Sequence, residues 1–215
     1  MNYALRIFHI SKKFSKLMNN KIIKRLPQCL FGLFLCGFGL AFTVEAKLGL
    51  NPWDVFHDGF SKLINVRIGF AGVLTGFIVL LGWIPLKQKP FLGTIIYILT
   101  IGNVLDLTMY FLPTPDQIWL QHFYLYFGTV LFAMGVGIYI GSGLGPGPRD
   151  GIMTGIAKRG PSVRATRIGI DFTAFVTGVL LGGSFGYGTV FMVLVTGPIV
   201  QFSLKRYDKG AIFSL

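Results

Sequence analysis

Six long apolar segments constrain the fold of this chain more than any other feature. A helix needs about 20 apolar residues to cross the roughly 30 Å of hydrocarbon in a bilayer, and each segment has about that length. No segment alternates polar and apolar residues, so helices rather than barrel strands must satisfy the backbone hydrogen bonds. The sequence therefore predicts an all-α polytopic membrane protein with six transmembrane helices, at 28–46, 67–85, 91–112, 120–141, 163–183 and 187–204.

The composition agrees with this class. Hydrophobic residues make up 53% of the chain and charged residues 13%, a balance too apolar for an ordinary soluble domain. The basic start, the apolar core and "VEA" at 44–46 have the pattern of a signal peptide, but a similar segment recurs inside the chain, so we expect the first one to be uncleaved. Cys29 and Cys36 are about 10 Å apart along one helix, too far to form a disulfide, and should be packing residues.

The distribution of cations predicts which side of the membrane each connection faces. Of the 20 Lys and Arg residues, all but Lys47, Lys62 and Arg67 lie before the first segment, in the second connection, around the fourth connection or in the tail. Lys and Arg near the ends of spans are retained on the cytoplasmic side. Both termini and residue 87 should therefore be cytoplasmic, and residue 116 should be external.

The net charge of +12 does not indicate a nucleic-acid partner, because the topology rule and attraction to an anionic lipid leaflet account for it. We expect the lipid bilayer to be the partner of this charge. Residues 1–27 form a basic cytoplasmic arm. Its pattern allows either a helix lying on the membrane surface or a disordered segment.

The sequence repeats itself once. Residues 28–113 and 114–206 align with each other, and each half holds three spans. The matching positions include Leu48-Gly49 with Leu144-Gly145, Pro52 with Pro148, Ile68-Gly69 with Ile168-Gly169, and 93–102 with 188–197. Because three is an odd number, the second half must enter the membrane from the opposite side. We therefore expect two inverted three-helix repeats related by a pseudo-twofold axis in the membrane plane, with a cytoplasmic tail at 207–215.

A short half-helix follows the first span of each repeat. Its start combines a cap residue, a proline in the first turn and an aspartate that meets free backbone N–H groups. These residues are Asn51, Pro52 and Asp54 in the first copy and Gly147, Pro148 and Asp150 in the second. Each half-helix has about ten to twelve residues, too few to span. Two interpretations stay open: the half-helices lie at the water interface, or they dip inward and point their N-termini at a shared cavity.

The glycine-rich stretch "GLGPGPRDG" at 143–151 is not a phosphate loop. No Gly-Lys-Ser/Thr follows it, no strand precedes it, and its twin at 47–59 lacks the glycine run. A metal-dependent phosphotransferase is disfavoured too, since the later spaced aspartates that would hold two metals are absent. The three histidines have no ligand-like spacing, and no Ser or Cys nucleophile has a plausible base. We therefore expect no catalytic residue, no metal and no cofactor, and a protein that is not an enzyme.

The candidate ligand-binding residues come mainly from the two half-helix starts. If the half-helices dip inward, their N-termini and Arg149 favour a solute with an anionic group. Asp54 and Asp150 offset part of this positive field, so the sign of the charge on the solute stays open. The candidates are Asn51, Pro52, Trp53, Asp54, Gly147, Pro148, Arg149 and Asp150, with Asp106 as a further one.

Two aspartates lie inside predicted spans, where a charge needs a partner or a purpose. Asp106 falls at the repeat position of Gln201, which suggests a polar pair across the pseudo-twofold axis and places Asp106 among the candidate ligand-binding residues. For Asp171 we expect a bond to Arg167, one turn earlier on the same helix.

Four stretches of the sequence resemble the YczE/YyaS/YitT-type bacterial integral membrane proteins. They are "GLFLCGFGLAF", "LGLNPWDVFHDG", "LGPGPRDG" and "GTVFMVLVTGPIVQ". The resemblance covers about residues 28–206 and implies a multi-pass protein of the bacterial cytoplasmic membrane. It implies no particular substrate.

Together these features predict a small-solute transporter or permease for an anionic or zwitterionic solute. The alternative is a non-transporting membrane scaffold or regulator that holds a partner, such as a biosynthetic enzyme, at its basic cytoplasmic surfaces. A third hypothesis is an intramembrane enzyme. A polar cavity that reaches the membrane midplane would favour transport, whereas a packed interior with an exposed apolar patch would favour the partner role. The sequence leaves the substrate, the coupling ion and the formation of a homo-oligomer open.

Overall fold

The computed structural model describes the backbone of residues 2–157, 159–161 and 163–210, and within them the side chains from residue 20 onward except 154, 157, 163, 164 and 167. All regular structure in these residues is helical, which confirms the all-α class. The helices are α1 (Asn2–Glu45), α2 (Pro52–Ile64), α3 (Ile68–Leu81), α4 (Leu92–Phe111), α5 (Ile118–Gly141), α6 (Pro148–Ala157), α7 (Val163–Leu180) and α8 (Tyr187–Tyr207).

Four of these helices are long and apolar enough to cross a membrane, namely Asn20–Glu45 of α1, α4, α5 and α8. α2 and α3 together make a fifth candidate, although they meet at an angle of 105°. Six spans were expected, and two of them are shorter than the sequence predicts. α3 has 14 residues, because Gly82 and the following turn end it early. α7 has 18 residues and ends at Leu180, before the predicted end of its span at 183.

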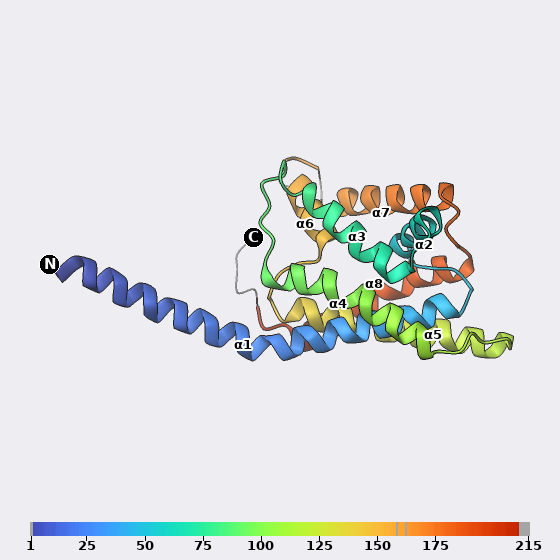
Figure 1. Ribbon diagram of the computed structural model, residues 1–215, viewed down its shortest axis with the longest axis horizontal. Helices are drawn as coiled ribbons and strands as arrows, with labels where there is room; N and C mark the ends of the chain where they lie inside the picture. The colour runs from blue at the N-terminus through green and yellow to red at the C-terminus, as the bar shows by residue number, and fades with distance from the viewer. Residues whose placement is uncertain (1, 158, 162, 211–215) are drawn as a thin grey trace.

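The helices form two layers (Figure 1). The four-helix layer consists of α1, α4, α5 and α8, in which α1 packs against α4 and α5, and α5 packs against α8. The short-helix layer consists of α2, α3, α6 and α7, in which α2 packs against α3 and α7, and α6 packs against the same two helices. The main contact between the layers in the described residues is that of α3 with α4.

Glycines bring backbones into contact inside both layers. A Cβ built at Gly32 of α1 would lie 2.8 Å from the carbonyl oxygen of Gly135 of α5, and one at Gly39 would lie 2.6 Å from that of Gly128. Because the residue number rises on one helix as it falls on the other, α1 and α5 run antiparallel. In the short-helix layer, a Cβ at Gly59 would lie 2.6 Å from the carbonyl oxygen of an α7 residue, Gly178. Small residues permit such close approach between helices in membranes.

Cys29 and Cys36 are both fully buried and free, which confirms their expected packing role. They belong to the main apolar core, which also contains Leu33 of α1 and Leu125 of α5. The core therefore lies mainly within the four-helix layer.

The two half-helix starts form as the sequence predicts. The Asn51 side chain accepts a hydrogen bond of 3.3 Å from the Trp53 N–H, and Pro52 is the first residue of α2. Pro148 likewise begins α6. α2 has 13 residues and α6 has 10, so neither reaches across a bilayer by itself.

The connection before each half-helix accepts a hydrogen bond from the first turn of the last helix in the other half of the chain. The Leu48 carbonyl accepts a hydrogen bond of 2.9 Å from the N–H of Gly188, at the start of α8. At the matching position, the Leu144 carbonyl accepts one of 2.9 Å from the N–H of Gly93, at the start of α4. The two halves are therefore interlocked.

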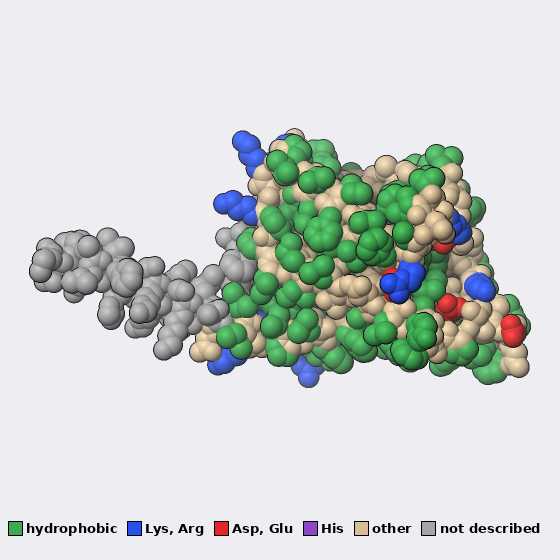
Figure 2. All heavy atoms as spheres, in the orientation of Figure 1, with side chains coloured by type: hydrophobic (Ala, Val, Ile, Leu, Met, Phe, Trp, Pro, Cys, Tyr) green, Lys and Arg blue, Asp and Glu red, His purple; other side chains and the backbone are tan. Residues whose placement is uncertain are grey.

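Charge is distributed unevenly over the surface (Figure 2). Hydrophobic side chains cover most of the visible face. Several Lys and Arg side chains lie at the end of the molecule that adjoins the N-terminal part of α1, whereas the visible Asp and Glu side chains lie toward the opposite end, among further Lys and Arg. The first and last described residues both lie at the basic end (Figure 1).

Candidate functional site

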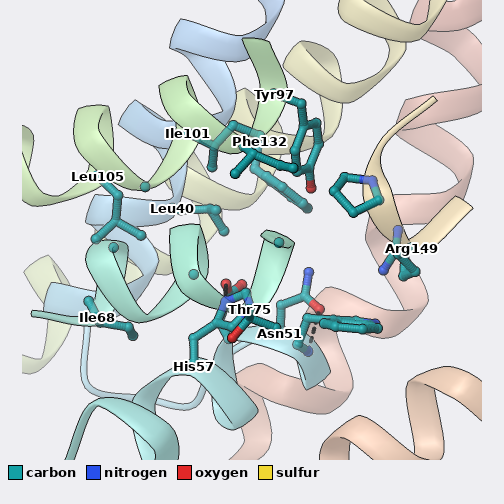
Figure 3. A pocket seen from close by; sticks show the side chains of 18 of the residues that line it. Leu40, Asn51, His57, Ile68, Thr75, Tyr97, Ile101, Leu105, Phe132 and Arg149 are labelled. Atoms are coloured by element: carbon teal, nitrogen blue, oxygen red, sulfur yellow. Dashed lines mark hydrogen bonds and ion pairs between the residues drawn. The ribbon is translucent and has the colours of Figure 1, made fainter. Parts of the chain in front are cut away.

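A cavity of about 100 Å³ lies between the two layers, where the first turns of α2 and α6 meet (Figure 3). Its polar lining comes from both half-helices, from α3 and from two tyrosines of the four-helix layer. These residues are Asn51, Trp53, Asp54, His57, Thr75, Tyr97, Tyr139 and Arg149. Apolar residues such as Leu40, Ile101 and Phe132 complete the wall on the side of α1, α4 and α5.

The structure thus brings predicted residues from both repeats into one place. Those in the cavity lining are Asn51, Trp53, Asp54, Pro148 and Arg149. Pro52 begins α2 directly beside them. Gly147 and Asp150 are not in the lining but lie next to it, at the hydroxyl group of Tyr139.

Opposite partial and full charges meet at the two helix starts. The N-terminus of a helix carries a partial positive charge, and both α2 and α6 begin at the cavity. Each also carries an aspartate in its first turn, Asp54 in α2 and Asp150 in α6. These carboxylates compensate the helix ends, so the helix N-termini alone do not make this an anion site.

Arg149 is held by two carboxylates. Its Nε lies 3.8 Å from Asp150 Oδ1, and its Nη1 lies 3.5 Å from Asp171 Oδ1 on α7. The Asp171 carboxylate also accepts a hydrogen bond of 2.9 Å from Trp53 Nε1. Asp171 therefore joins α2, α6 and α7 around the site, a role that sequence reasoning missed. The side chain of Arg167, its expected partner, lies outside the described residues.

Asp54 is buried and pairs with a histidine on its own helix. Its side chain is 8% exposed, and its Oδ1 lies 3.3 Å from His57 Nδ1. Residues three apart share one face of a helix, which is why both line the cavity. That spacing was the sequence signal that could have added His57 to the predicted site.

Two tyrosines that meet edge to face form the polar part of the opposite wall. The ring centroids of Tyr97 and Tyr139 are 5.4 Å apart. Tyr139 Oη donates a hydrogen bond of 3.4 Å to Asp150 Oδ2. A Cβ at Gly147 would lie 3.1 Å from Tyr139 Oη, so a glycine at this cap position lets the second half-helix approach the ring. In a chain with 21 Phe and 8 Tyr, nothing in the sequence separates these two tyrosines from packing aromatics.

Asp106 lies outside the cavity lining. Its carboxylate accepts hydrogen bonds from the N–H groups of Gly69, at 2.8 Å, and Phe70, at 3.1 Å. Arg67 Nε lies 3.7 Å away. Asp106 therefore caps α3 and fastens it to α4, while Gln201, its repeat counterpart, is exposed. Ligand binding by Asp106 stays a prediction.

A second, apolar groove of about 630 Å³ lies among α2, α3, α6 and α7. It shares Trp53, Thr75 and Val79 with the first cavity, so the two spaces adjoin. Among the described residues, no three His, Cys, Asp or Glu side chains are grouped so that they could hold a metal ion.

The chain matches a family of unknown function, DUF6198, over residues 23–205. It is 35% identical over 183 residues to an uncharacterized protein of Haemophilus influenzae, covering 85% of this chain and 84% of that protein. It is 31% identical over 193 residues to the uncharacterized membrane protein YczE of Bacillus subtilis, covering 88% and 89%. It is 24% identical over 177 residues to YyaS of the same organism, covering 79% and 87%. No solved structure matches the chain.

These relatives confirm the resemblance that the repeated Pro-Asp motifs indicate. The similarity spans both half-helices and all four helices of spanning length. The chain is therefore a membrane protein that belongs to the DUF6198 family and is related to YczE.

Proposed function

We propose that this protein transports a small zwitterionic solute across the bacterial cytoplasmic membrane. The observation that carries the proposal is the cavity at which two half-helices from opposite halves of the chain begin, with Asp54 and Arg149 in one lining. Discontinuous helices that meet at such a site are typical of transporters built from inverted repeats. The interlocking bonds at Leu48 and Leu144 support the same repeat relation.

In the proposed topology, α1, α3 and α4 cross the membrane in the first half, and α5, α7 and α8 cross it in the second. α2 and α6 are re-entrant half-helices that enter from opposite sides. The excess of Lys and Arg at the end that holds both described termini supports cytoplasmic termini (Figure 2). α3 and α7 are short for spans, so we expect them to tilt little and the bilayer to thin beside them.

The charges of the site favour a zwitterion over a simple anion. Arg149 can bind a carboxylate of the solute, but Asp150 and Asp171 already compensate its charge. Asp54 offers a second carboxylate, of which His57 occupies one oxygen. In the proposed binding mode, an ammonium group pairs with Asp54, and the rings of Trp53 and Tyr97 in the same lining attract it through their faces.

Uptake into proteoliposomes tests the proposal. Purified protein is reconstituted, and accumulation is compared for labelled amino acids and betaine, for monocarboxylates and for monoamines. We expect accumulation of members of the first group, and we expect Asp54→Asn to reduce it at least about tenfold by removing one carboxylate. Lys89→Ala is the matched control, since Lys89 is exposed and lies outside the cavity lining.

A negative result would have a clear meaning. If no class accumulates, transport of these solutes is refuted. A deletion strain with altered activity of one biosynthetic enzyme, and no altered solute, would then favour the non-transporting regulator.

A further inference from the structure

The two halves of the chain differ in how the second span packs on the third, that is, α3 on α4 in the first half and α7 on α8 in the second. In the first half, a Cβ built at Gly69 of α3 would overlap the carbonyl oxygen of Gly102 of α4, and one at Gly102 would overlap that of Gly69. Their repeat counterparts are Gly169 of α7 and Gly197 of α8. A Cβ at either of these positions meets none of the described neighbouring atoms within 4 Å. α3 is therefore seated on α4, whereas α7 stands away from α8.

Side-chain exposure shows the same asymmetry. Ile68 is 9% exposed, whereas its counterpart Ile168 is 60% exposed. Ile98 of α4 is 3% exposed, whereas its counterpart Val193 of α8 is 58% exposed. An apolar face of α8 is thus uncovered at the position where α3 covers α4.

The uncovered face carries the same sequence pattern as the covered one. The sequence Arg-Ile-Gly occurs at 67–69 and again at 167–169, and "LTIG" at 99–102 aligns with "LVTG" at 194–197. No described neighbour requires glycine at these two positions, although glycine in a helix costs about 1 kcal/mol relative to alanine. A second conformation in which the two glycines meet would account for both of them.

We propose that the short-helix layer rocks on the four-helix layer between two states, and that α7 seats on α8 through Gly169 and Gly197 when α3 leaves α4. This inference rests on the proposed transport function. The rocking motion exchanges the conformations of the two repeats, which share one sequence pattern. Each layer is held internally by glycine contacts, at Gly39 with Gly128 and at Gly59 with Gly178, so each can move as a body.

The asymmetry also indicates which of the two proposed states this structure represents. The seated contact joins the first turn of α3 to the middle of α4, close to Asp106. Its counterpart would join the first turns of α7 to the middle of α8, and α7 begins toward the end that carries both described termini (Figure 1). Under the proposed motion, and with cytoplasmic termini, this is the state in which the cavity faces the cytoplasm.

Pairs of spin labels on equivalent positions test the exchange. In a background with Cys29 and Cys36 replaced by alanine, one pair replaces Phe70 and Leu107 and reports on α3 and α4. The other replaces their counterparts, Ile170 and Phe202, and reports on α7 and α8. In lipid nanodiscs, pulsed electron resonance should give a short distance for the first pair and a longer one for the second.

Two glycine substitutions should push the equilibrium in opposite directions. Gly69→Ala puts an atom into the seated contact, so the first distance should lengthen while the second shortens. Gly169→Leu is accommodated here but fills the proposed contact, so it should keep both distances and slow uptake at least about tenfold. Ile168→Leu, beside it on α7 and of equal volume, should leave both readouts unchanged.

The two hypotheses fail separately. If Gly69→Ala lengthens the first distance and leaves the second unchanged, α3 has merely come loose and the rocking is refuted, whatever the uptake. If Gly169→Leu transports at the normal rate, the rocking is also refuted while transport stands. If no solute is transported but the distances exchange, the transport function fails and the motion stands.

Discussion

The interior of the four-helix layer and the interface between the two layers are packed in opposite ways. In the first, α1 and α5 touch backbone to backbone at Gly32 with Gly135 and at Gly39 with Gly128. In the second, the layers enclose a cavity of about 100 Å³ with charged groups in its lining. The comparison teaches that the α1–α5 contact tolerates no added atom, while the cavity between the layers, beside the tight α3–α4 contact, has room and charge for a solute.

The largest expected effect comes from adding bulk to the four-helix layer. Gly39→Leu places a side chain where even a Cβ would lie 2.6 Å from the Gly128 carbonyl oxygen. Overpacking costs about 1–3 kcal/mol where side chains can yield, and more is expected here because the neighbour is backbone. We expect little or no folded protein in size-exclusion chromatography. Gly169→Leu adds the same side chain at an open position and should fold normally, so similar yields for both would contradict the comparison.

A smaller effect is expected at the charged cluster of the interface. Arg149→Ala removes the cation that faces Asp150 and Asp171, so we expect solute uptake to be lost. Neither carboxylate is fully buried, and Asp171 keeps its bond from Trp53, so we expect the protein still to insert and fold. Fluorescence-monitored unfolding and uptake separate the two readouts. Full uptake by the variant would remove Arg149 from the site.

The smallest effect is expected where the layers touch. Asp106→Asn leaves an acceptor for one of the two N–H groups of α3 and removes the charge that faces Arg67. Hydrogen bonds to charged groups contribute about 1.5–3 kcal/mol, so the unfolding temperature should fall. The distribution of distances between spin labels at positions 70 and 107 should also broaden. Asp116→Asn, at an exposed position in a connection, is the control. Equal stability of the two variants would show that Asp106 does not fasten α3.

Periodicity and length predicted much of the fold. The apolar segments gave four helices of spanning length, and the cap, proline and aspartate pattern predicted that α2 begins at Pro52 and α6 at Pro148. The length of α3 was overestimated, because hydropathy continues through Trp83 and Ile84 although Gly82 has already ended the helix. Local helix-stop chemistry therefore decided what average hydropathy could not.

The candidate site was predictable where the repeat pointed to it and nowhere else. Comparing the two copies identified Trp53, Asp54 and Arg149, which do line one cavity. Tyr97 and Asp171 were missed because they lie on helices whose place beside the half-helices is set by tertiary packing. The expected pairing of Asp171 with Arg167 stays a prediction, because that side chain lies outside the described residues. The described partners of Asp171, Trp53 and Arg149, come from α2 and α6, which local spacing does not indicate.

The central claim is that the two half-helices enter the membrane from opposite faces. Single cysteines, in a background that lacks Cys29 and Cys36, test it directly with an impermeant thiol reagent on intact cells. Leu63→Cys marks the end of α2, and Lys89→Cys marks the connection beside the end of α6, where Arg159 binds the Pro85 carbonyl at 2.7 Å. The account predicts labelling at 63 in intact cells and at 89 only after permeabilisation, whereas labelling of both cysteines in intact cells would contradict it.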